Sequence, residues 1–403
     1  MAMGYKQMVI RKVPRDWKVA KLKKIVVECK TGIPVKQQDR IPGPYPYFGA
    51  NGVIDYVHDH IFDGDYIIVA QDGSIGAIQY FSGKFWANNH VWVIKVRSSA
   101  SLKFMYYILQ TLNWKRLATG STRPKVTEQI LLSADIPLPP IKEQRKIVEV
   151  LSVVDLAIGK VDEVIAKTER LKKGLMQELL TKGIGHKEFK DTKIGKTPKT
   201  WQIVEFREII DMISGRYFKF SEFCEEGIRC LKIDNVGFGE VVWETSTFLP
   251  NNYVQKYPEL VLKGGDIVLA LNRPIIDNKV KVGMLKKEDY PSILYQRVGK
   301  VIIKDKTKID KRFLAFAFTG EHFKRQLGHS LIGTDQPYVR TPILLKIKTP
   351  LPPVSEQQRI AEIFSAVDKK LELERKEKAK LERIKWGLMD LLLTGKVRVK
   401  VAD

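Results

Sequence analysis

A long segment of this chain occurs twice, and this duplication restricts the possible folds more than any other feature. Residues 137–181 match residues 350–394 at 22 of 45 positions, without a gap and at a constant offset of 213. Both copies contain Leu-Pro-Pro-x-x-Glu-Gln near the start and finish with Gly-Leu-Met followed by Leu-Leu-Thr. Self-similarity of this kind indicates repeated structural units, so the chain consists of two related halves.

A second, weaker repeat marks the start of each half. Val13-Pro14-Arg15-Asp16-Trp17 is echoed by Thr197-Pro198-Lys199-Thr200-Trp201 at an offset of 184, so the stretch between the two motifs is 29 residues longer in the second half. The chain therefore has the order variable region, fixed segment, longer variable region, fixed segment. A polar, glycine-containing linker at about 182–197 separates the halves.

The fixed segments predict two long helices. Proline is compatible with a helix start, and Glu143 falls in the first turn, where the helix dipole favours a carboxylate. Apolar residues then recur at steps of four and three, as in the seam of a coiled coil. They are Ile147, Leu151, Val154, Ile158, Val161 and Ile165 in the first copy, and Ile360, Phe364, Val367, Leu371, Ile384, Leu388, Leu391 and Leu392 in the second. About 40 residues at ~1.5 Å each give arms on the order of 60 Å long.

Two interpretations of these helices are open. They could be ordinary core helices, one in each domain, although a seam of this length is hard to bury inside a small domain. We favour arms that pack on each other. Because the chain must return to begin its second half, the arms are expected to be antiparallel and to hold the two modules apart. The highly charged stretch 372–383 is expected to be a solvated face or a docking face for another subunit.

The variable regions 13–136 and 197–349 predict compact domains around a twisted sheet. Strand-like runs occur at 66–70 and 90–94 in the first region and at 266–270 and 298–303 in the second. One helix is expected near the end of each region, at 102–111 and at 312–327. The predicted fold class is α+β: two small mixed α/β domains joined by two long antiparallel coiled-coil helices, with an internal pseudo-twofold repeat.

The charge of the chain favours a polyanionic partner. The formal net charge is +23 and the isoelectric point is near 9.7. A lysine-rich, thermostable surface is the alternative explanation. No apolar run is long enough for a membrane span, the first residues do not form a secretory signal, and three cysteines give no disulfide framework. These features predict a cytoplasmic protein.

Polar side chains suited to reading DNA bases occur in the loops of both variable regions. Arginine pairs naturally with guanine, asparagine and glutamine pair with adenine, and lysine and serine contact phosphate. In the first region the candidates are Asn51, Gln71, Ser74, Asn89, His90, Ser121, Arg123 and Lys125; in the second they are Asn235, Asn272, Arg273, Arg297, Gln336, Tyr338 and Arg340. For each residue the alternative is a turn or capping role. The loops around Arg123 and Arg340 are the preferred candidates, because both occupy the same place relative to the proline motif.

The sequence contains no motif that is typical of a catalytic site. The chain has no Asn- or Asp-Pro-Pro-aromatic tetrapeptide and no glycine-rich cofactor turn of an adenine methyltransferase. Residues 194–197 (Ile-Gly-Lys-Thr) resemble the end of a phosphate-binding loop, but Lys190 stands where its first glycine is required. His58-Asp59-His60 has no further ligand at a useful spacing, so no metal site is predicted. The chain is therefore expected not to be an enzyme.

Together these motifs resemble the specificity subunits of type I restriction–modification systems. The resemblance covers the whole chain and rests on the duplicated Leu-Pro-Pro-x-x-Glu-Gln segment, the Gly-Leu-Met…Leu-Leu-Thr helix end and the Pro-x-x-Trp start of each half. Residues 49–52 (Gly-Ala-Asn-Gly), 88–91 (Asn-Asn-His-Val) and 264–268 (Gly-Gly-Asp-Ile-Val) are similar to recurring features of the family's target recognition domains. The resemblance implies a first target recognition domain at 1–136, a first helix at 137–183, a linker and second domain at 184–349, and a second helix at 350–403.

The same resemblance implies a bipartite DNA site read by two inverted domains. It also implies that two methyltransferase subunits dock on the helices and that motor-endonuclease subunits complete the complex. Adenine methylation would use S-adenosylmethionine bound by the methyltransferase, with no cofactor in this chain, and base flipping would also belong to that partner.

Two rival functions remain at the level of sequence. One is an adaptor with two binding modules on a coiled-coil spacer and no role for DNA; the other is a stand-alone DNA enzyme of unfamiliar type. A steeply salt-dependent affinity for DNA would argue against the first. Methylation or cleavage by the chain alone would favour the second.

Overall fold

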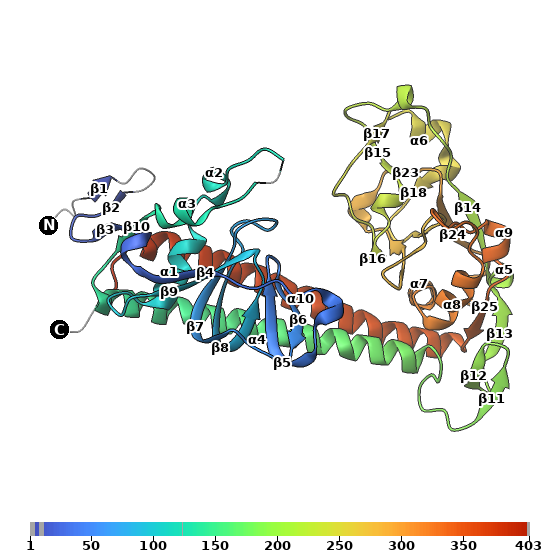
Figure 1. Cartoon of the computed structure of the whole chain (residues 1–403). Coiled ribbons are helices and arrows are strands. Elements are labelled where there is room, and N and C mark those ends of the chain that lie inside the picture. Colours follow the sequence, from blue (N-terminus) through green and yellow to red (C-terminus); the bar gives the residue numbers. More distant parts are fainter. Residues whose placement is uncertain (1–4, 8–11, 123, 401–403) are drawn as a thin grey trace. The chain divides into compact units, whose positions relative to one another are not determined.

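The computed structural model describes residues 5–7, 12–122 and 124–400, and it divides into two compact units (Figure 1). The first unit contains residues 1–163 and 375–403, and the second contains residues 164–374. The two long helices are α4 (Ile141–Leu179) and α10 (Val354–Leu393), and each contributes residues to both units. Each unit therefore combines one variable region with a portion of both predicted helices.

The first unit is built around a six-stranded sheet with the strand order β4-β9-β7-β8-β5-β6. These strands are β4 (Val26–Thr31), β9 (Val91–Val96), β7 (Phe62–Ala70), β8 (Ile78–Ala87), β5 (Pro42–Gly49) and β6 (Gly52–Val57). Neighbouring strands are antiparallel except for β5 and β8, which are parallel. The predicted strands at 66–70 and 90–94 lie within or overlap β7 and β9.

Strand β7 separates two hydrophobic cores. Ile67 and Val69 face a core that includes α1 (Leu102–Gln110), whereas Tyr66 and Ile68 face an aromatic core closed by β5 and β8. This alternation follows from the two-residue period of a strand. Two short helices, α2 (Trp114–Leu117) and α3 (Glu128–Leu132), follow α1. The expected helix at 102–111 is thus confirmed as α1.

The second unit repeats this plan with more strands. A five-stranded sheet has the order β14-β24-β19-β22-β16, and a four-stranded sheet has the order β17-β15-β23-β18. The strands are β14 (Ile210–Ser214), β24 (Val298–Ile303), β19 (Ile267–Ala270), β22 (Val282–Met284), β16 (Phe238–Glu240), β17 (Phe248–Leu249), β15 (Ile228–Leu231), β23 (Ser292–Leu294) and β18 (Val261–Leu262). Strand β19 again alternates between two cores, with Ile267 and Leu269 on one side and Val268 and Ala270 on the other.

One predicted helix of the second region is interrupted. The expected helix at 312–327 is divided into α7 (Lys311–Ala317) and α8 (Glu321–His329). The first helix ends at its C-cap Phe318, and Gly320, with an extended backbone, is the N-cap at which α8 begins. The remaining helices of this unit are α5 (Phe206–Ile209), α6 (Tyr253–Lys256) and α9 (Thr341–Leu344).

A small antiparallel sheet brings together the two ends of each variable region. Strand β3 (Lys18–Lys21) pairs with β10 (Asp135–Leu138), and β13 (Gln202–Glu205) pairs with β25 (Lys348–Leu351). In both units the first strand follows the Pro-x-x-Trp motif and the second strand precedes the Pro-Pro pair. The linker folds as a hairpin of β11 (Phe189–Thr192) and β12 (Gly195–Pro198), and β12 contains most of the residues that resemble a phosphate-binding loop.

The two repeated motifs of each half are joined by hydrogen bonds. The indole Nε1 of Trp17 donates to Oε2 of Glu143 (3.2 Å), and the indole Nε1 of Trp201 donates to Oε2 of Glu356 (2.9 Å). The neighbouring glutamines cap helices: Oε1 of Gln144 accepts from the amide of Ser101 at the start of α1, and Oε1 of Gln357 accepts from the amide of Asp310 at the start of α7. The Glu-Gln pair therefore fixes each domain to the beginning of a long helix.

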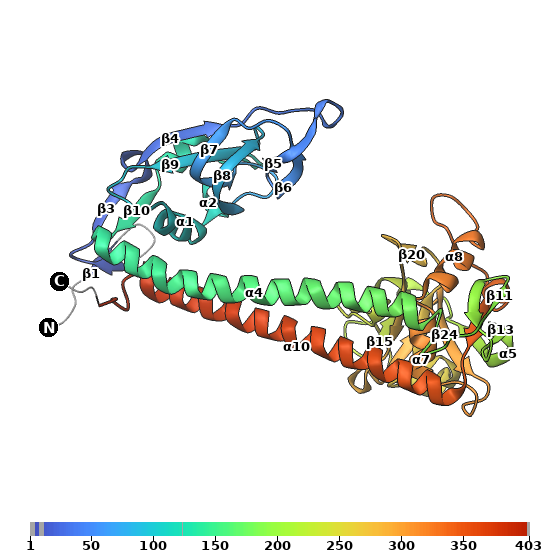
Figure 2. The ribbon, with the colours of Figure 1, turned by 90° about the horizontal axis from the view of Figure 1, so that it is seen from below.

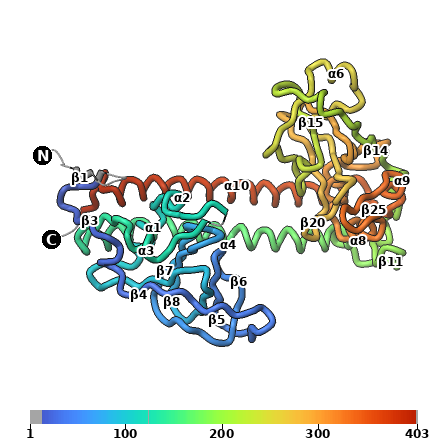
Figure 3. Tube along the Cα trace, turned by 45° about the horizontal axis from the view of Figure 1, so that its top comes forward, coloured from blue at the N-terminus to red at the C-terminus, as the bar shows by residue number. Residues whose placement is uncertain are grey.

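The end of the opposite helix completes each attachment. In the first unit Met389 and Leu392 of α10 are buried with Trp17 and Leu151, and Figure 3 shows the end of α10 beside the start of α4. The guanidinium of Arg398 contacts both Glu143 and Asp16. In the second unit Leu179 of α4 is buried with Trp201 and Phe364, and Nε2 of His186 lies 2.8 Å from Oε1 of Glu356.

The helices are antiparallel within each unit, as predicted (Figure 2). In the first unit Lys385 pairs with Asp155 and Lys378 pairs with Asp162. The residue numbers of the partners therefore rise along α4 while they fall along α10, as in an antiparallel pair. In the second unit Lys172 pairs with Asp368. Asp155 also accepts from the buried Tyr107 hydroxyl, and burial together with this carboxylate raises the pKa of Tyr107.

The expected apolar seam is correct only in part. Ile147, Leu151, Ile360 and Phe364 are buried where the helices meet the domains, and Val154, Ile158, Val161 and Ile165 are partly exposed. Ile384 and Leu391 are exposed, which corrects their expected place in the seam. Ion pairs occupy part of the contact line, so fewer apolar side chains are needed between the helices than the heptad pattern predicts.

Removal of the Glu143 carboxylate is expected to weaken the first unit. Glu143→Ala leaves the Trp17 indole and part of the Arg398 guanidinium without their acceptor, and breaking a buried pair of this kind costs about 3 kcal/mol. Urea denaturation measures the loss. Glu149→Ala is the control, because Glu149 lies on the same helix and makes only an exposed ion pair with Lys146; it is expected to change the stability by less than about 0.5 kcal/mol. Equal losses in the two variants would contradict the structural role of Glu143.

Candidate nucleic-acid interface

The same backbone hydrogen bonds assemble the candidate loops in both domains. In the first domain the amide of Gln71 donates to the carbonyl of His90 (3.0 Å), and the carbonyl of Gln71 accepts from Val126 (2.8 Å). In the second domain the amide of Leu271 donates to the carbonyl of Arg297 (2.8 Å), and its carbonyl accepts from Val339 (2.9 Å). Three loops that are distant in sequence therefore meet at one edge of each sheet.

One of these loops is a further part of the internal repeat. Thr119 pairs with Lys125 in the first domain, and Ile332 pairs with Tyr338 in the second, at the same offset of 213 as the proline motif. The loops between them read Gly-Ser-Thr-Arg-Pro and Gly-Thr-Asp-Gln-Pro. Ser121 and Lys125 are exposed, whereas Arg123 lies outside the described residues.

This alignment corrects one detail of the sequence interpretation. The loops 120–124 and 333–337 occupy equivalent places, and at the offset of the repeat Arg123 matches Gln336 in the sequence rather than Arg340. Arg340 instead corresponds to Thr127: these residues are the N-caps of α9 and α3. The sequence contains the signal for this register, because Gly120 and Gly333, as well as Pro124 and Pro337, match at the offset of the repeat.

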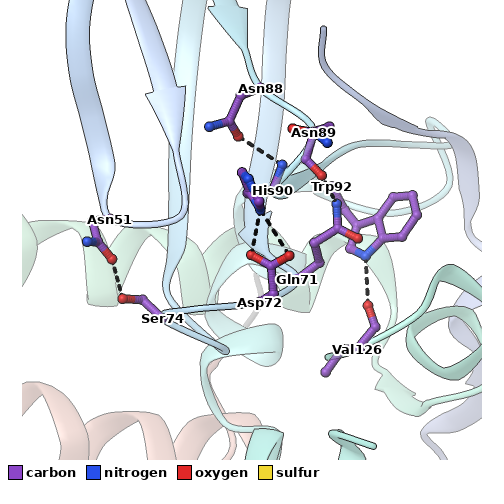
Figure 4. A network of polar contacts seen from close by, with 9 residues as sticks. All are labelled: Asn51, Gln71, Asp72, Ser74, Asn88, Asn89, His90, Trp92 and Val126. Atoms are coloured by element: carbon purple, nitrogen blue, oxygen red, sulfur yellow. Dashed lines mark hydrogen bonds and ion pairs between the residues drawn. The ribbon is translucent and has the colours of Figure 1, made fainter. Parts of the chain in front are cut away.

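The first domain presents a connected polar edge (Figure 4). The hydroxyl of Ser74 donates to Oδ1 of Asn51, which joins two turns. Nδ1 of His90 lies 2.8 Å from Oδ1 of Asp72, and the amide of His90 donates to Oδ1 of Asn88. Asn51, Asn89 and His90 are exposed, and Ser74 is partly exposed. The sequence interpretation therefore found most of this edge but missed Asp72, the partner of His90.

Two candidate residues support the loops from inside. Gln71 is only 1% exposed, and its side-chain amide donates to the carbonyl of Asn89. Asn235 is 2% exposed; its side chain accepts from the amide of Lys232 and donates to the carbonyls of Val242 and Thr245. Both side chains are buried and bonded to main chain, so the structure argues against direct DNA contact for either of them.

The second domain presents arginines at the equivalent edge. Asn272 pairs with Tyr338 across two chain segments, and the amide of Arg273 donates to the carbonyl of Pro337 (2.6 Å). The side chains of Arg273, Arg297, Gln336 and Arg340 are exposed, and those of Asn272 and Tyr338 are partly exposed. Arg216 joins this edge because its carbonyl accepts from the amide of Gln296, next to Arg297. Sequence reasoning missed Arg216, which no motif marks.

The backbone of this edge is strained at two arginines. Arg273 and Arg297 have φ values of 43° and 67°, a left-handed conformation that costs a side-chain-bearing residue about 1–2 kcal/mol. At the position equivalent to Arg273 the first domain has Gly73, with φ 64° and no such cost. Both domains thus need a left-handed backbone at this position. The first domain has glycine there, and the second has arginine. In the described part of the chain the Arg273 and Arg297 side chains make no hydrogen bond or ion pair, so a contact outside the chain accounts best for this choice.

The described residues offer no cluster of metal ligands. They contain no group of three or more His, Cys, Asp or Glu residues placed to hold a metal ion. Burial raises the pKa of the Cys29 and Cys230 thiols to about 12, which makes both poor nucleophiles at neutral pH. Among the described helices, none is both long enough and apolar enough to cross a membrane.

Two domains of one frame, each with a polar loop edge and each fixed to a pair of antiparallel helices, define a paired recognition subunit. The chain belongs to the type I restriction–modification specificity subunit family: the family model Methylase_S, the type I restriction modification DNA specificity domain, matches residues 14–167 and 198–383. The two matches cover the two predicted halves. The adaptor alternative finds no support in this family.

Relatives and solved structures agree with this assignment. The chain is 43% identical over 413 residues to the type I restriction enzyme MjaVIII specificity subunit of Methanocaldococcus jannaschii, with 98% of this chain and 96% of the relative covered. It is 29% identical over 432 residues to the putative MjaX specificity subunit of the same organism, with 98% and 97% covered. The fold is similar to the crystal structure of a type I S subunit from M. genitalium, with a TM-score of 0.60, 18% identity and coverage of 97% and 99%.

Replacement of Arg273 by glycine separates the effect of this arginine on protein stability from its effect on DNA affinity. Arg273→Gly introduces the residue that the first domain has at this position, so the protein is expected to keep its stability or gain up to about 1 kcal/mol. The affinity for the cognate DNA duplex is expected to fall about tenfold or more, because a good arginine–guanine contact contributes ~1–3 kcal/mol. Unfolding curves and fluorescence anisotropy measure the two effects.

Asn278→Gly is the matched control for this experiment. Asn278 also has a left-handed backbone (φ 60°), but it lies in the turn between β20 (Ile275–Ile276) and β21 (Lys279–Val280), where the turn itself requires that conformation. The control is expected to have similar stability and unchanged DNA affinity. A loss of stability in Arg273→Gly would contradict the backbone strain assigned to this arginine, and an unchanged affinity would contradict a DNA-contacting role.

Proposed function

We propose that this chain reads a bipartite site in double-stranded DNA, with one target recognition domain for each half. The observation that carries this proposal is the repeated loop edge: one backbone frame presents different exposed side chains in the two domains. A common frame with different side chains is what two related readers of different sequences require. Base contacts supply the sequence choice, and contacts to phosphate supply most of the affinity.

The charge of the chain supports DNA as the ligand. The sequence has 69 lysine and arginine residues against 46 aspartate and glutamate residues. Each phosphate neutralised by such a cation releases counterions, so the affinity should fall steeply as salt is added. An adaptor for an uncharged ligand would not show this dependence.

We further propose that methyltransferase subunits dock on the long helices. Large apolar side chains are exposed there in both units: Val153, Leu156, Ile384 and Trp386 in the first, and Leu171 and Leu373 in the second. Exposed apolar groups of this kind mark surfaces that a partner covers. Their presence in both units supports two methyltransferase copies, and motor-endonuclease subunits would complete the restriction complex.

In this proposal the chain itself catalyses nothing. S-adenosylmethionine binds the methyltransferase, which flips and methylates the adenine, and this chain determines which adenine is presented. Cleavage belongs to the motor-endonuclease subunits. The complex is expected to act in the cytoplasm, where its DNA substrate lies and where three free cysteines remain reduced.

A map of methylated adenines tests the proposal. Cells that co-express this chain with its methyltransferase are expected to show one two-part motif with a fixed gap, and the motif should disappear when this chain is omitted. Exchange of region 13–136 for that of a related subunit should change only one half of the motif. Methylation that does not depend on this chain, or a continuous motif, would reject the bipartite reading.

A further inference from the structure

One turn of the second domain presents an aromatic side chain almost entirely to solvent. Phe220 is 93% exposed and begins the short 3-10 turn η3 (Phe220–Glu222). It lies in the loop that leaves β14 through Gly215. Exposure of a whole phenyl ring gives no benefit to folding, because burial of apolar area is what stabilises the folded chain. Folding therefore does not explain this exposed ring.

The turn that carries Phe220 is firmly braced. The carboxylate of Glu222 accepts from the amide of Lys219 (2.7 Å) and from the hydroxyl of Tyr253 (2.7 Å). Phe218, two residues before Phe220, is 1% exposed and packs against the rings of Tyr253 and Tyr257. Phe218 thus anchors the loop in the core while Phe220 is exposed, so the backbone of the turn that carries the phenyl ring is held in a defined place.

The loop also adjoins the arginine edge. Arg216 begins it, and the Arg216 carbonyl accepts from the amide of Gln296 (3.0 Å), the neighbour of Arg297. On the other side of the turn, the Phe223 ring lies 6.0 Å from that of Tyr295, and Nζ of Lys232 lies over both rings. A ligand held by Arg297 would therefore have Phe220 within the same loop cluster.

The first domain contains the same turn with a different tip. Gly32 is equivalent to Gly215, because each packs directly against a main-chain carbonyl. A Cβ added to Gly32 would lie 1.7 Å from the carbonyl oxygen of Ala87, and a Cβ added to Gly215 would lie 2.0 Å from that of Tyr295. Five residues later each domain has a 3-10 turn, η2 (Gln37–Asp39) or η3. The amide of Asp39 donates to Lys36, as the amide of Glu222 donates to Lys219. Gln37 therefore occupies the position of Phe220.

The charges around the turn favour nucleic acid on one side of it. Arg216 and Lys219 are exposed before Phe220, next to the exposed Arg273 and Arg297 of the neighbouring loops. The acidic residues Glu225 and Glu226 follow the turn, where the amide of Cys224 donates to the carbonyl of Phe248 in β17. The exposed cations precede the phenyl ring, on the segment whose main chain contacts Gln296, and phosphate is therefore favoured on that side of the turn.

We propose that Phe220 is a stacking wedge, which inserts at a base step of the DNA beside the bases that Arg273 and Arg297 contact. Aromatic and apolar side chains of DNA-binding proteins unstack base steps in this way, and stacking is tolerant of sequence because every base has a π face. The first domain presents Gln37 at the same point and contacts its half-site without insertion. The inference rests on the proposed DNA-reading function and adds a local deformation in the second half-site only.

The test uses the full-length chain with its methyltransferase and a duplex that carries the mapped motif. Phe220→Ala is expected to weaken binding about tenfold, the size typical of one lost base–aromatic contact, whereas Phe220→Trp is expected to stay within about threefold of the natural chain. Phe220→Gln, which copies the first domain, should behave like Phe220→Ala. Because the side chain is almost fully exposed, none of the three substitutions should lower the melting temperature.

Phe238→Ala is the matched control. Phe238 is half exposed and lies on β16, the strand at the opposite edge of the five-stranded sheet from β14. This variant is expected to bind the duplex like the natural chain. Equal affinities of Phe220→Ala and Phe238→Ala would overturn the proposal.

A fluorescent base locates the insertion. Duplexes with 2-aminopurine at successive positions are expected to brighten at one step of the second half-site with the natural chain, and at none of its steps with Phe220→Ala. A Phe220→Ala variant that binds DNA normally but no longer co-purifies with the methyltransferase would overturn the wedge and place Phe220 in a protein contact. If the natural complex shows no specific motif at all, the DNA-reading function itself fails, which is a different result.

Discussion

The hydrogen bond between a tryptophan indole and a helix carboxylate is the contact on which the rest of this structure depends. Trp17 donates to Glu143, and Trp201 donates to Glu356, so each half fixes the start of its domain to the start of its own long helix. Arg398 and His186, which follow the ends of the opposite helices, reach the same two carboxylates. Each glutamate thus joins three chain segments, and this explains why the Pro-x-x-Trp and Glu-Gln motifs are repeated together.

From this attachment the position of each loop edge follows. The central strands β7 and β19 are buried on both faces, so they are rigid supports for the residues that follow them. Gln71 and Leu271 stand at the ends of these strands and bind two further loops through main-chain hydrogen bonds. Because main-chain groups make the frame, the side chains at its surface are free to differ between the domains.

The two domains use this freedom in different ways. The first has Gly73, the His90–Asp72 pair and Gln37 at its edge, whereas the second has Arg273, Arg297 and Phe220 at the corresponding places. The second edge is more cationic and more aromatic, and it accepts backbone strain that the first avoids. Strain of this kind is retained where the side chain has a use outside the folded chain, which is the physical basis for proposing that the second edge contacts a ligand.

The sequence by itself determined the duplicated plan, the two long helices, the mixed α/β domains and most of the exposed loop residues, because repeats, heptads and strand periodicity are local in the chain. It did not reveal that Gln71 and Asn235 are buried or that Ile384 and Leu391 are exposed. Burial depends on which distant segments meet, and no local pattern encodes that. Only the tertiary structure placed Arg216 beside Gln296 and Arg297, and with it the loop that carries Phe220, because that contact joins a loop after the first strand of the sheet to a turn about 80 residues later in the chain.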